Sequence, residues 1–277
     1  MKFIAPNIGA TKCAMEKEFD FAVECAAEAR HFEMVQYLCE NGALCDEDNF
    51  NGAVKGNDME ICKYVYSKCV EAGNTMFDRW EMYRASDNNN LEMVKYLWEV
   101  AKAPCDFATL DHAAMHGNME MVRYLVETCK CGYDSCQIIS SAAEHGHLDI
   151  IKYLVASCPG ITCVCAINKA ARNGHLDAVK YLFETLKDTC TAEAMDDAAC
   201  YGHLEVVIYL HRVVKAKHTR NAMLRAALYN HLEVVKYLYT FVKFTPKLIT
   251  EVIAKSKKRK HFEIAAFLEF ATNKHKI

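Results

Sequence analysis

One nine-residue phrase recurs along the chain and limits what the chain can fold into. Residues 174–182 read Gly-His-Leu-Asp-Ala-Val-Lys-Tyr-Leu, and eight further copies resemble this phrase and end 27 to 32 residues apart. The nine copies close at Leu38, Val65, Leu97, Leu125, Leu154, Leu182, Leu210, Leu238 and Leu268. Repetition with a period of about 20–50 residues is typical of proteins built from stacked similar units.

The repeats also indicate how the chain is divided. A length of 277 residues alone would indicate about two domains. In a repeat array each unit contacts only its neighbours, so the length measures the number of copies instead. We therefore expect one elongated array over residues 20–270, with an N-terminal segment at 1–19 and a C-terminal tail at 271–277.

The phrase has the pattern of a buried α-helix. Leu176, Val179 and Leu182 follow an i, i+3, i+6 spacing, which places them on one side of a helix. The position after Leu176 is acidic in every copy, where it favours the positive end of the helix dipole. The position before Leu176 is His in six copies, Asn in two and Asp in one, so we expect a polar cap in the same turn.

A second, shorter helix is predicted before each phrase. Ile167, Ala170 and Ala171 are spaced i, i+3 and i+4, and the small alanines allow two helices to approach closely. The junction residue is Gly in four copies and Asn in three, which are the residues that tolerate a left-handed backbone. We expect a tight left-handed turn there. Only Arg30 and Lys260 depart from this pattern, and both lie in terminal copies, where repeats are expected to be atypical.

A helix–turn–helix unit carrying Ala-Ala-x-x-Gly-His-Leu-(Glu/Asp)-x-Val-x-Tyr-Leu resembles the ankyrin repeat. The period here is about 28 residues, whereas a standard ankyrin repeat has about 33. The Thr-Pro-Leu-His phrase that opens a standard repeat is missing, and residues 193–196 read Glu-Ala-Met-Asp in its place. The resemblance implies an all-α chain, an α-solenoid of about nine helix-turn-helix ankyrin-like repeats with reduced or absent β-hairpin fingers.

The resemblance also implies a non-catalytic scaffold that binds another protein. In the ankyrin family the inner helices line a concave face, and the two positions after Ala-Ala vary among binding members. Here these positions are Met115, His116, Glu144, His145, Arg172, Asn173, Cys200, Tyr201, Leu228 and Tyr229. Aromatic residues on a rigid surface are frequent centres of binding energy, which favours Tyr201 and Tyr229. The alternative is that these positions are ordinary exposed helix surface.

The small net charge hides a strong polarity. Residues 1–210 hold 18 Lys+Arg and 32 Asp+Glu, a net charge of -14, whereas residues 211–277 hold 15 and 4, a net charge of +11. Such a field steers partners electrostatically. The basic end contains Lys255, Lys257, Lys258, Arg259 and Lys260. We interpret this run first as the polar face of a capping repeat, second as a nuclear-import or anionic-partner signal, and last as a nucleic-acid contact.

Two alternative functions stay open beside the protein-binding scaffold. One is a substrate-recognition adaptor of the ubiquitin-ligase type. The other is a nuclear or nucleic-acid-associated factor that uses the basic C-terminal end. The common nucleotide-binding, zinc-protease and serine-hydrolase motifs are missing from the sequence, so we expect no catalytic residue, no cofactor and no small-molecule substrate.

Two groups of residues could suggest a metal site. Cysteines cluster at Cys129, Cys131, Cys136, Cys158, Cys163 and Cys165. Several of them occupy equivalent positions of successive repeats, about 8–10 Å apart if helix packing sets the spacing, which is too far for one zinc ion. His147 is the recurrent histidine of its copy, which leaves only His145 unexplained. We therefore expect small buried cysteines and no metal.

Composition favours a cytoplasmic protein, with a nuclear location as the alternative. The N-terminus makes a poor secretory signal, and the 15 cysteines are therefore expected to be reduced thiols. No apolar run approaches 18 residues, so we expect no membrane-spanning helix. We expect a monomer whose partner is another protein.

Overall fold

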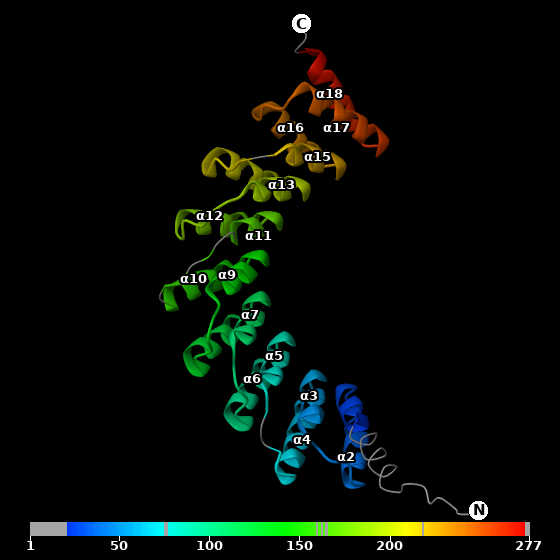
Figure 1. Cartoon of the computed structure of the whole chain (residues 1–277), viewed down its shortest axis with the longest axis vertical. Helices are drawn as coiled ribbons and strands as arrows, with labels where there is room; N and C mark the ends of the chain where they lie inside the picture. The colour runs from blue at the N-terminus through cyan, green and yellow to red at the C-terminus, as the bar shows by residue number, and fades with distance from the viewer. Residues whose placement is uncertain are drawn as a thin grey trace, which may run out of the picture. The chain divides into compact units, whose positions relative to one another are not determined.

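The chain folds into paired α-helices, as Figure 1 shows for the computed structural model. The structure describes residues 21–74, 77–158, 160–161, 163, 166–217 and 219–274. The predicted N-terminal segment and the last three residues of the predicted tail lie outside these ranges. The chain divides into two compact units, residues 1–133 and 134–277.

The first unit consists of two layers of short helices. After a helix at residues 21–28, its helices are α2 (Phe32–Glu40), α3 (Glu47–Lys55), α4 (Met59–Glu71), α5 (Arg79–Asp87), α6 (Leu91–Tyr96), α7 (Phe107–Met115) and α8 (Met119–Tyr124). The π-helical segments η1 (Leu97–Ala101) and η2 (Leu125–Cys129) extend α6 and α8. Helices α3, α5 and α7 pack in a row, and each packs on the helix that follows it in the chain.

The second unit repeats this arrangement. Its helices are α9 (Ser135–Glu144), α10 (Leu148–Ser157), α11 (Ala166–Arg172), α12 (Leu176–Glu184), α13 (Ala192–Cys200), α14 (Leu204–Tyr209), α15 (Arg220–Leu228), α16 (Leu232–Phe241), α17 (Pro246–Lys258) and α18 (Phe262–Lys274). The segment η3 (Leu210–Val214) extends α14. Helices α9, α11, α13, α15 and α17 form one layer, and α10, α12, α14, α16 and α18 form the other.

The predicted all-α solenoid is confirmed. No residue in the described ranges belongs to a β-strand, so short connections replace the fingers of a standard repeat there. The core is thin and lies between the two layers. In the copy that closes at Leu182, the side chains of Ala170, Ala171, Val179 and Leu182 are all fully buried. Burial of such side chains against neighbouring copies is what stabilises a repeat that has no large core of its own.

The predicted left-handed turns are present in all nine copies. The backbone φ angles at the junction are +61 at Arg30, +56 at Asn57, +54 at Asn89, +75 at Gly117, +77 at Gly146, +81 at Gly174, +82 at Gly202, +66 at Asn230 and +65 at Lys260. Arg30 and Lys260 therefore adopt the same conformation as the glycines, although a side chain with a Cβ atom costs about 1 kcal/mol there. The terminal copies therefore have the same left-handed turn, and they differ only in the type of residue at the junction.

Contrary to the expectation from the sequence, histidine does not cap its own helix. His31, His147, His175, His203 and His231 precede helices α2, α10, α12, α14 and α16, and none makes a side-chain capping hydrogen bond. The imidazoles of His175, His203 and His231 pack against the preceding repeat instead. His175 Nε2 lies 3.1 Å from the carbonyl oxygen of Glu144, and His261 Nδ1 lies 2.9 Å from that of Ala227. The recurrent histidine thus connects two repeats.

The same imidazole explains why glycine stands at the junction. A Cβ atom added to Gly146 would lie 2.5 Å from His175 Nδ1, and one added to Gly174 would lie 2.5 Å from His203 Nδ1. Both distances are far below van der Waals contact. Glycine is therefore required for two reasons. The backbone is left-handed at this position, and any Cβ atom would overlap with the imidazole ring that packs against it.

Asparagine forms a different joint in the first unit. Asn90 and Asn118 cap α6 and α8 by accepting hydrogen bonds from the backbone N–H groups of Met93 and Met121. Asn90 Nδ2 also donates to Asn57 Oδ1 at 2.7 Å. Asn118 Nδ2 donates to Asn89 Oδ1 at 2.8 Å in the same way. The Asn junctions Asn57 and Asn89 are thus each followed by an Asn cap. The Gly junctions of the second unit are followed by His, and so is the third Asn junction, Asn230, which His261 follows.

A second series of left-handed residues closes the outer helices. Lysine adopts positive φ at Lys102, Lys130, Lys187 and Lys215, five residues after the closing leucine of its copy. The backbone amide after each lysine bonds the closing leucine carbonyl, for example Asp188 N to Leu182 O at 3.1 Å. The side chain helps, because Lys187 Nζ donates to the carbonyl oxygen of Glu184. A lysine at a helix C-terminus also complements the helix dipole.

The Lys-Tyr pair of the phrase stacks between copies. Lys95 Nζ lies 5.6 Å from the ring centroid of Tyr124, and Lys152 Nζ lies 5.8 Å from that of Tyr181. Each lysine thus covers the aromatic ring of the next copy. A cation within about 6 Å of an aromatic ring is attracted to its face.

Candidate protein-binding face

The positions predicted to contact a partner lie where the first helices end. The second residue of each pair is exposed in all five copies, namely His116, His145, Asn173, Tyr201 and Tyr229. The first residue varies more: Arg172 is exposed, Met115, Glu144 and Leu228 are half-buried, and Cys200 is buried. Cys200 therefore offers a partner little surface.

In the second unit these residues form one continuous face. They extend from neighbouring helices α9, α11, α13 and α15. Arg172 Nη2 donates a hydrogen bond of 3.0 Å to the hydroxyl of Tyr201, and its guanidinium lies 5.4 Å from the ring centroid. Arg172 and Tyr201, which belong to successive copies, thus contact each other, and this contact limits their freedom before any partner binds.

Ion pairs connect the same helices on this face. Lys169 Nζ lies 2.8 Å from Glu144 Oε2, and Arg225 Nη1 lies 2.9 Å from Asp197 Oδ1. The hydrogen bond from Lys169 holds the pKa of Glu144 below its ordinary value. Partly exposed pairs of this kind contribute about 0–1 kcal/mol each to stability, so their main effect is to fix side-chain positions.

Two tyrosines dominate the exposed apolar area of this face. The exposed fraction is 48% for Tyr201 and 61% for Tyr229. Both follow helices whose preceding alanine pair is buried, so a rigid backbone carries them. An aromatic ring on a rigid support can bury a large area at little cost in conformational entropy.

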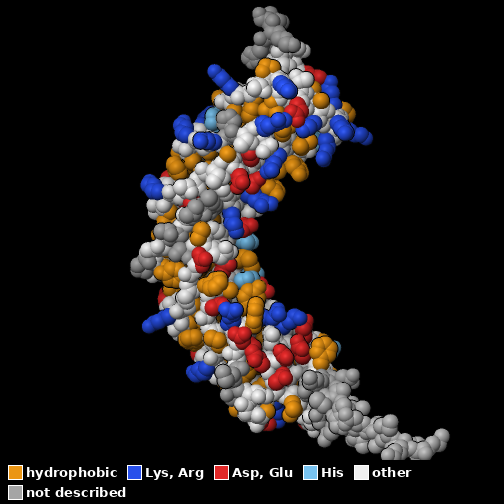
Figure 2. Space-filling model, viewed as in Figure 1, with side chains coloured by type: hydrophobic (Ala, Val, Ile, Leu, Met, Phe, Trp, Pro, Cys, Tyr) orange, Lys and Arg blue, Asp and Glu red, His pale blue; other side chains and the backbone are white. Residues whose placement is uncertain are grey.

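The basic run belongs to the end of α17 and the turn after it. Lys255 pairs with Glu251 at 2.8 Å, and Lys257 pairs with Glu269 at 2.5 Å. Lys258, Arg259 and Lys260 are exposed and form no ion pair within the described part of the chain. Figure 2 shows Lys and Arg side chains gathered over the C-terminal helices. Two of the five predicted basic residues therefore have structural partners, and three face solvent.

The cysteines differ in part from what was expected. Cys129 and Cys158 are buried as predicted, but Cys136 is exposed, Cys163 is half-buried, and Cys165 lies outside the described residues. Burial raises the pKa of Cys129 and of Cys163 to about 12, so both thiols stay protonated at neutral pH. These groups pack as small apolar side chains.

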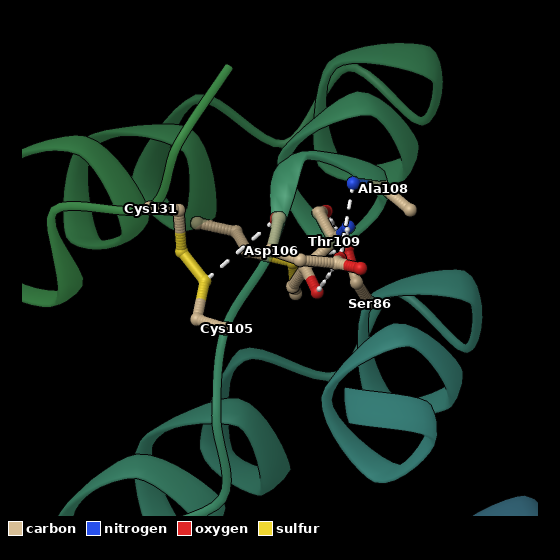
Figure 3. The surroundings of a disulfide bond; sticks show 7 residues. Ser86, Cys105, Asp106, Ala108, Thr109 and Cys131 are labelled. Carbon is tan, nitrogen blue, oxygen red and sulfur yellow. Dashed lines mark hydrogen bonds between the residues drawn. A yellow bond between two sulfur atoms is a disulfide. The ribbon is translucent and has the colours of Figure 1, made fainter. Parts of the chain in front are cut away.

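One cysteine pair contradicts the prediction of reduced thiols throughout. Cys105 and Cys131 form a disulfide in the first unit, with their Cα atoms 5.5 Å apart (Figure 3). The bond joins the connections that follow η1 and η2. Asp106 beside it caps α7 by accepting hydrogen bonds from the amides of Ala108 and Thr109. Equivalent connections of neighbouring copies thus lie close enough to be bonded, which spacing alone did not reveal.

A cluster of polar side chains at the ends of α5 and α7 was not predicted from the sequence. Asp87 Oδ1 lies 2.9 Å from His112 Nδ1 and 3.7 Å from His116 Nε2. The ring of Tyr83 packs against that of His112 with centroids 4.5 Å apart. Only His116 was singled out from the sequence. Asp87 follows Ala85 and Ser86, which occupy the Ala-Ala positions in its copy, so the repeat register would have located it.

Helix pairs stacked in two layers and joined by left-handed turns define an α-helical repeat protein. A family model of three ankyrin repeats matches residues 82–165, 141–218 and 167–247, which together span more than half of the chain. The chain therefore belongs to the ankyrin-repeat family, whose members are generic protein–protein interaction modules and are typically non-catalytic. No curated protein matches the chain. In the described residues, no helix combines the length and apolarity needed to cross a bilayer.

Proposed function

We propose that this protein is a non-catalytic scaffold that binds another protein through the face formed by α9, α11, α13 and α15. In this proposal the face has the role that the concave face has in the family. Binding requires no cofactor or small molecule, and the scaffold acts as a cytoplasmic monomer. The many free thiols among the described cysteines favour a reducing compartment, in which the Cys105–Cys131 bond would be reduced.

The exposure of Tyr201 and Tyr229 carries this proposal. Both rings are about half exposed or more on helices whose other faces are packed. Large aromatic side chains at the centre of a surface are the residues that most often dominate binding energy. The contact of Arg172 with Tyr201 supports the proposal further, because the ring is already held in place.

The charge polarity of the chain sets how a partner approaches. The net charge of +11 in residues 211–277 lies next in sequence to a net charge of -14 in residues 1–210. A partner of opposite polarity is oriented by this field before contact. Electrostatic steering raises the association rate, and this effect decreases with ionic strength.

The proposal is tested by capture from a lysate of the cells that express the protein. A double variant, Tyr201→Ala with Tyr229→Ala, is compared with the unchanged protein and with Tyr37→Ala as a matched control. Tyr37 is 61% exposed but lies on α2, in the first unit. We expect at least one protein to bind the unchanged chain and the control, and to decrease more than tenfold with the double variant. Identical capture by all three would refute the assignment of this face.

The basic end supports a second candidate function, an import signal or a contact for an acidic partner. Lys258, Arg259 and Lys260 are the observation that favours it, since their charges face solvent without ion pairs in the described structure. Replacing residues 257–260 by serine tests this function. Loss of nuclear accumulation, or loss of captured acidic proteins, would support it. Unchanged location and capture would leave the run as the polar surface of the last repeat.

A further inference from the structure

We propose that Asp87, His112 and His116 form a binding site for one zinc ion. One candidate ligand atom from each residue lies within 4.8 Å of the other two. Asp87 is the last residue of α5, His112 lies in the last turn of α7, and His116 caps the same helix. The site departs from the expectation that the chain holds no metal, and it extends beyond the proposed function.

The spacing of the ligand atoms fits a tetrahedral ion. Zinc binds imidazole nitrogen and carboxylate oxygen at about 2.0–2.2 Å, so two ligand atoms at a tetrahedral angle lie about 3.4 Å apart. The Asp87–His112 and Asp87–His116 separations of 2.9 and 3.7 Å fall on either side of this value. His112 and His116 are four residues apart, so both project from one face of the same helix turn. A small closing movement of His116 completes the geometry.

The supports of the three side chains differ in a way that suits a metal site. The His112 side chain is 20% exposed, and the Tyr83 ring packs against it at a centroid distance of 4.5 Å. The side chains of His116 and Asp87 are 32% and 46% exposed. The His112 side chain is therefore held in place. His116 and Asp87 are accessible to solvent, so a zinc ion can reach the site. Three protein ligands and an open fourth position, filled by water or by a side chain of a bound protein, form a common zinc coordination.

The repeat register supplies an independent argument. The position of Asp87 in its copy corresponds to Glu144, and the position of His112 corresponds to Lys169. In the second unit those positions hold an ion pair of 2.8 Å, so the carboxylate is matched by a lysine ammonium group. In the first unit two imidazoles replace that lysine. Imidazole coordinates a metal in its neutral form, which allows a bound cation to supply the charge that Lys169 supplies elsewhere.

A simple His112–Asp87 hydrogen bond is the competing explanation, and zinc titration of the full chain separates the two. Titration calorimetry with zinc chloride is combined with NMR spectra of the histidine side chains. We expect the signals of His112 and His116 to shift together and to saturate at one equivalent. Each of Asp87→Asn, His112→Gln and His116→Gln is expected to weaken binding at least tenfold. Circular dichroism of each variant establishes that it is folded.

Matched controls exclude binding by thiols and by other histidines. His145→Gln removes an exposed histidine of an equivalent position and is expected to leave zinc affinity unchanged. The triple variant of Asp87, His112 and His116 gives the background from the free cysteines, several of which are exposed or half-buried. The proposal is overturned if the triple variant binds zinc as tightly as the unchanged chain. It is also overturned if His112 and His116 signals stay in place while one equivalent of zinc is taken up.

Discussion

The imidazole of His203 packs directly over Gly174 of the preceding repeat. A Cβ atom added to Gly174 would lie only 2.5 Å from His203 Nδ1. The two residues belong to successive copies of the phrase, one at the turn and one before helix α14. The contact makes the turn of one repeat and the start of the next repeat a single packed unit. It also explains why glycine and histidine recur together in the second unit.

Replacing Gly174 by alanine is expected to destabilise the protein by about 1–3 kcal/mol. The new Cβ adds steric strain at φ +81 and displaces the His203 ring. Gly73 is a matched control, because its φ is also +81 but nothing lies within 4 Å of an added Cβ. Chemical denaturation should show a smaller loss for Gly73→Ala. Equal losses for the two variants would mean that the His203 contact contributes nothing.

Acidification below about pH 6.5 is expected to destabilise the second unit. Burial lowers the pKa of His175 and of His203 below the ordinary value of 6.5. The unfolded chain then binds more protons than the folded chain in the window between the lowered pKa and 6.5, so stability falls as the pH falls through it. Histidine NMR titration and melting curves from pH 8 to 5 measure this. Titration of both residues above pH 6.5 would contradict it.

Replacing Glu81 by glutamine is expected to stabilise the protein at pH 8 and to change little at pH 4. Glu81 is 1% exposed, its Oε2 has no hydrogen-bond partner in the described structure, and burial raises its pKa to about 7. Because the pKa of Glu81 is higher in the folded chain, the folded chain binds more protons than the unfolded chain between pH 4.5 and about 7. The free energy of unfolding therefore decreases as the pH rises through this range. The gain at pH 8 should be on the order of 3 kcal/mol. Denaturation at both pH values tests the sign, and a loss at pH 8 would refute it.

Reduction of the Cys105–Cys131 bond is expected to lower the stability of the first unit. The two cysteines are 26 residues apart, and closing a loop of this length contributes about 3 kcal/mol. Cys105→Ser should therefore lower the melting temperature under oxidising conditions and have little effect in the presence of a reductant. Cys25→Ser is the control, since Cys25 is a free, exposed thiol. Peptide mapping without reductant checks the bond itself, and its absence would contradict this prediction.

The sequence predicted the fold closely because the repeat phrase encodes local geometry. Junction residues such as Gly174 and Asn57 can be identified from residue type alone, since few residues accept positive φ. The lysines at positive φ, such as Lys187, could not be identified in this way, because lysine has no preference for that conformation. Their turn is imposed by a backbone hydrogen bond to the closing leucine, such as that from Asp188 to Leu182.

The candidate sites were predicted less completely, since contacts between copies depend on how neighbouring helices are aligned. Tyr201 was identified from its variable position, but its contact with Arg172 required the structure. His112 was assigned no role, because nothing in the sequence shows that the side chain reaches Asp87. The disulfide was missed for the same reason, since Cys105 and Cys131 do not occupy equivalent positions.

The two kinds of joint also restrict how such a chain can be rebuilt by recombination. An asparagine junction such as Asn57 meets the amide of Asn90, whereas a glycine junction such as Gly174 meets an imidazole. Histidine also follows an asparagine junction, since His261 follows Asn230 and lies 2.9 Å from the carbonyl oxygen of Ala227. The amide hydrogen bond, in contrast, needs asparagine on both sides of the joint. A duplication or deletion that places an asparagine cap after a glycine junction therefore removes the amide hydrogen bond between the two copies, so an asparagine-capped repeat can be moved only behind a repeat whose junction is asparagine.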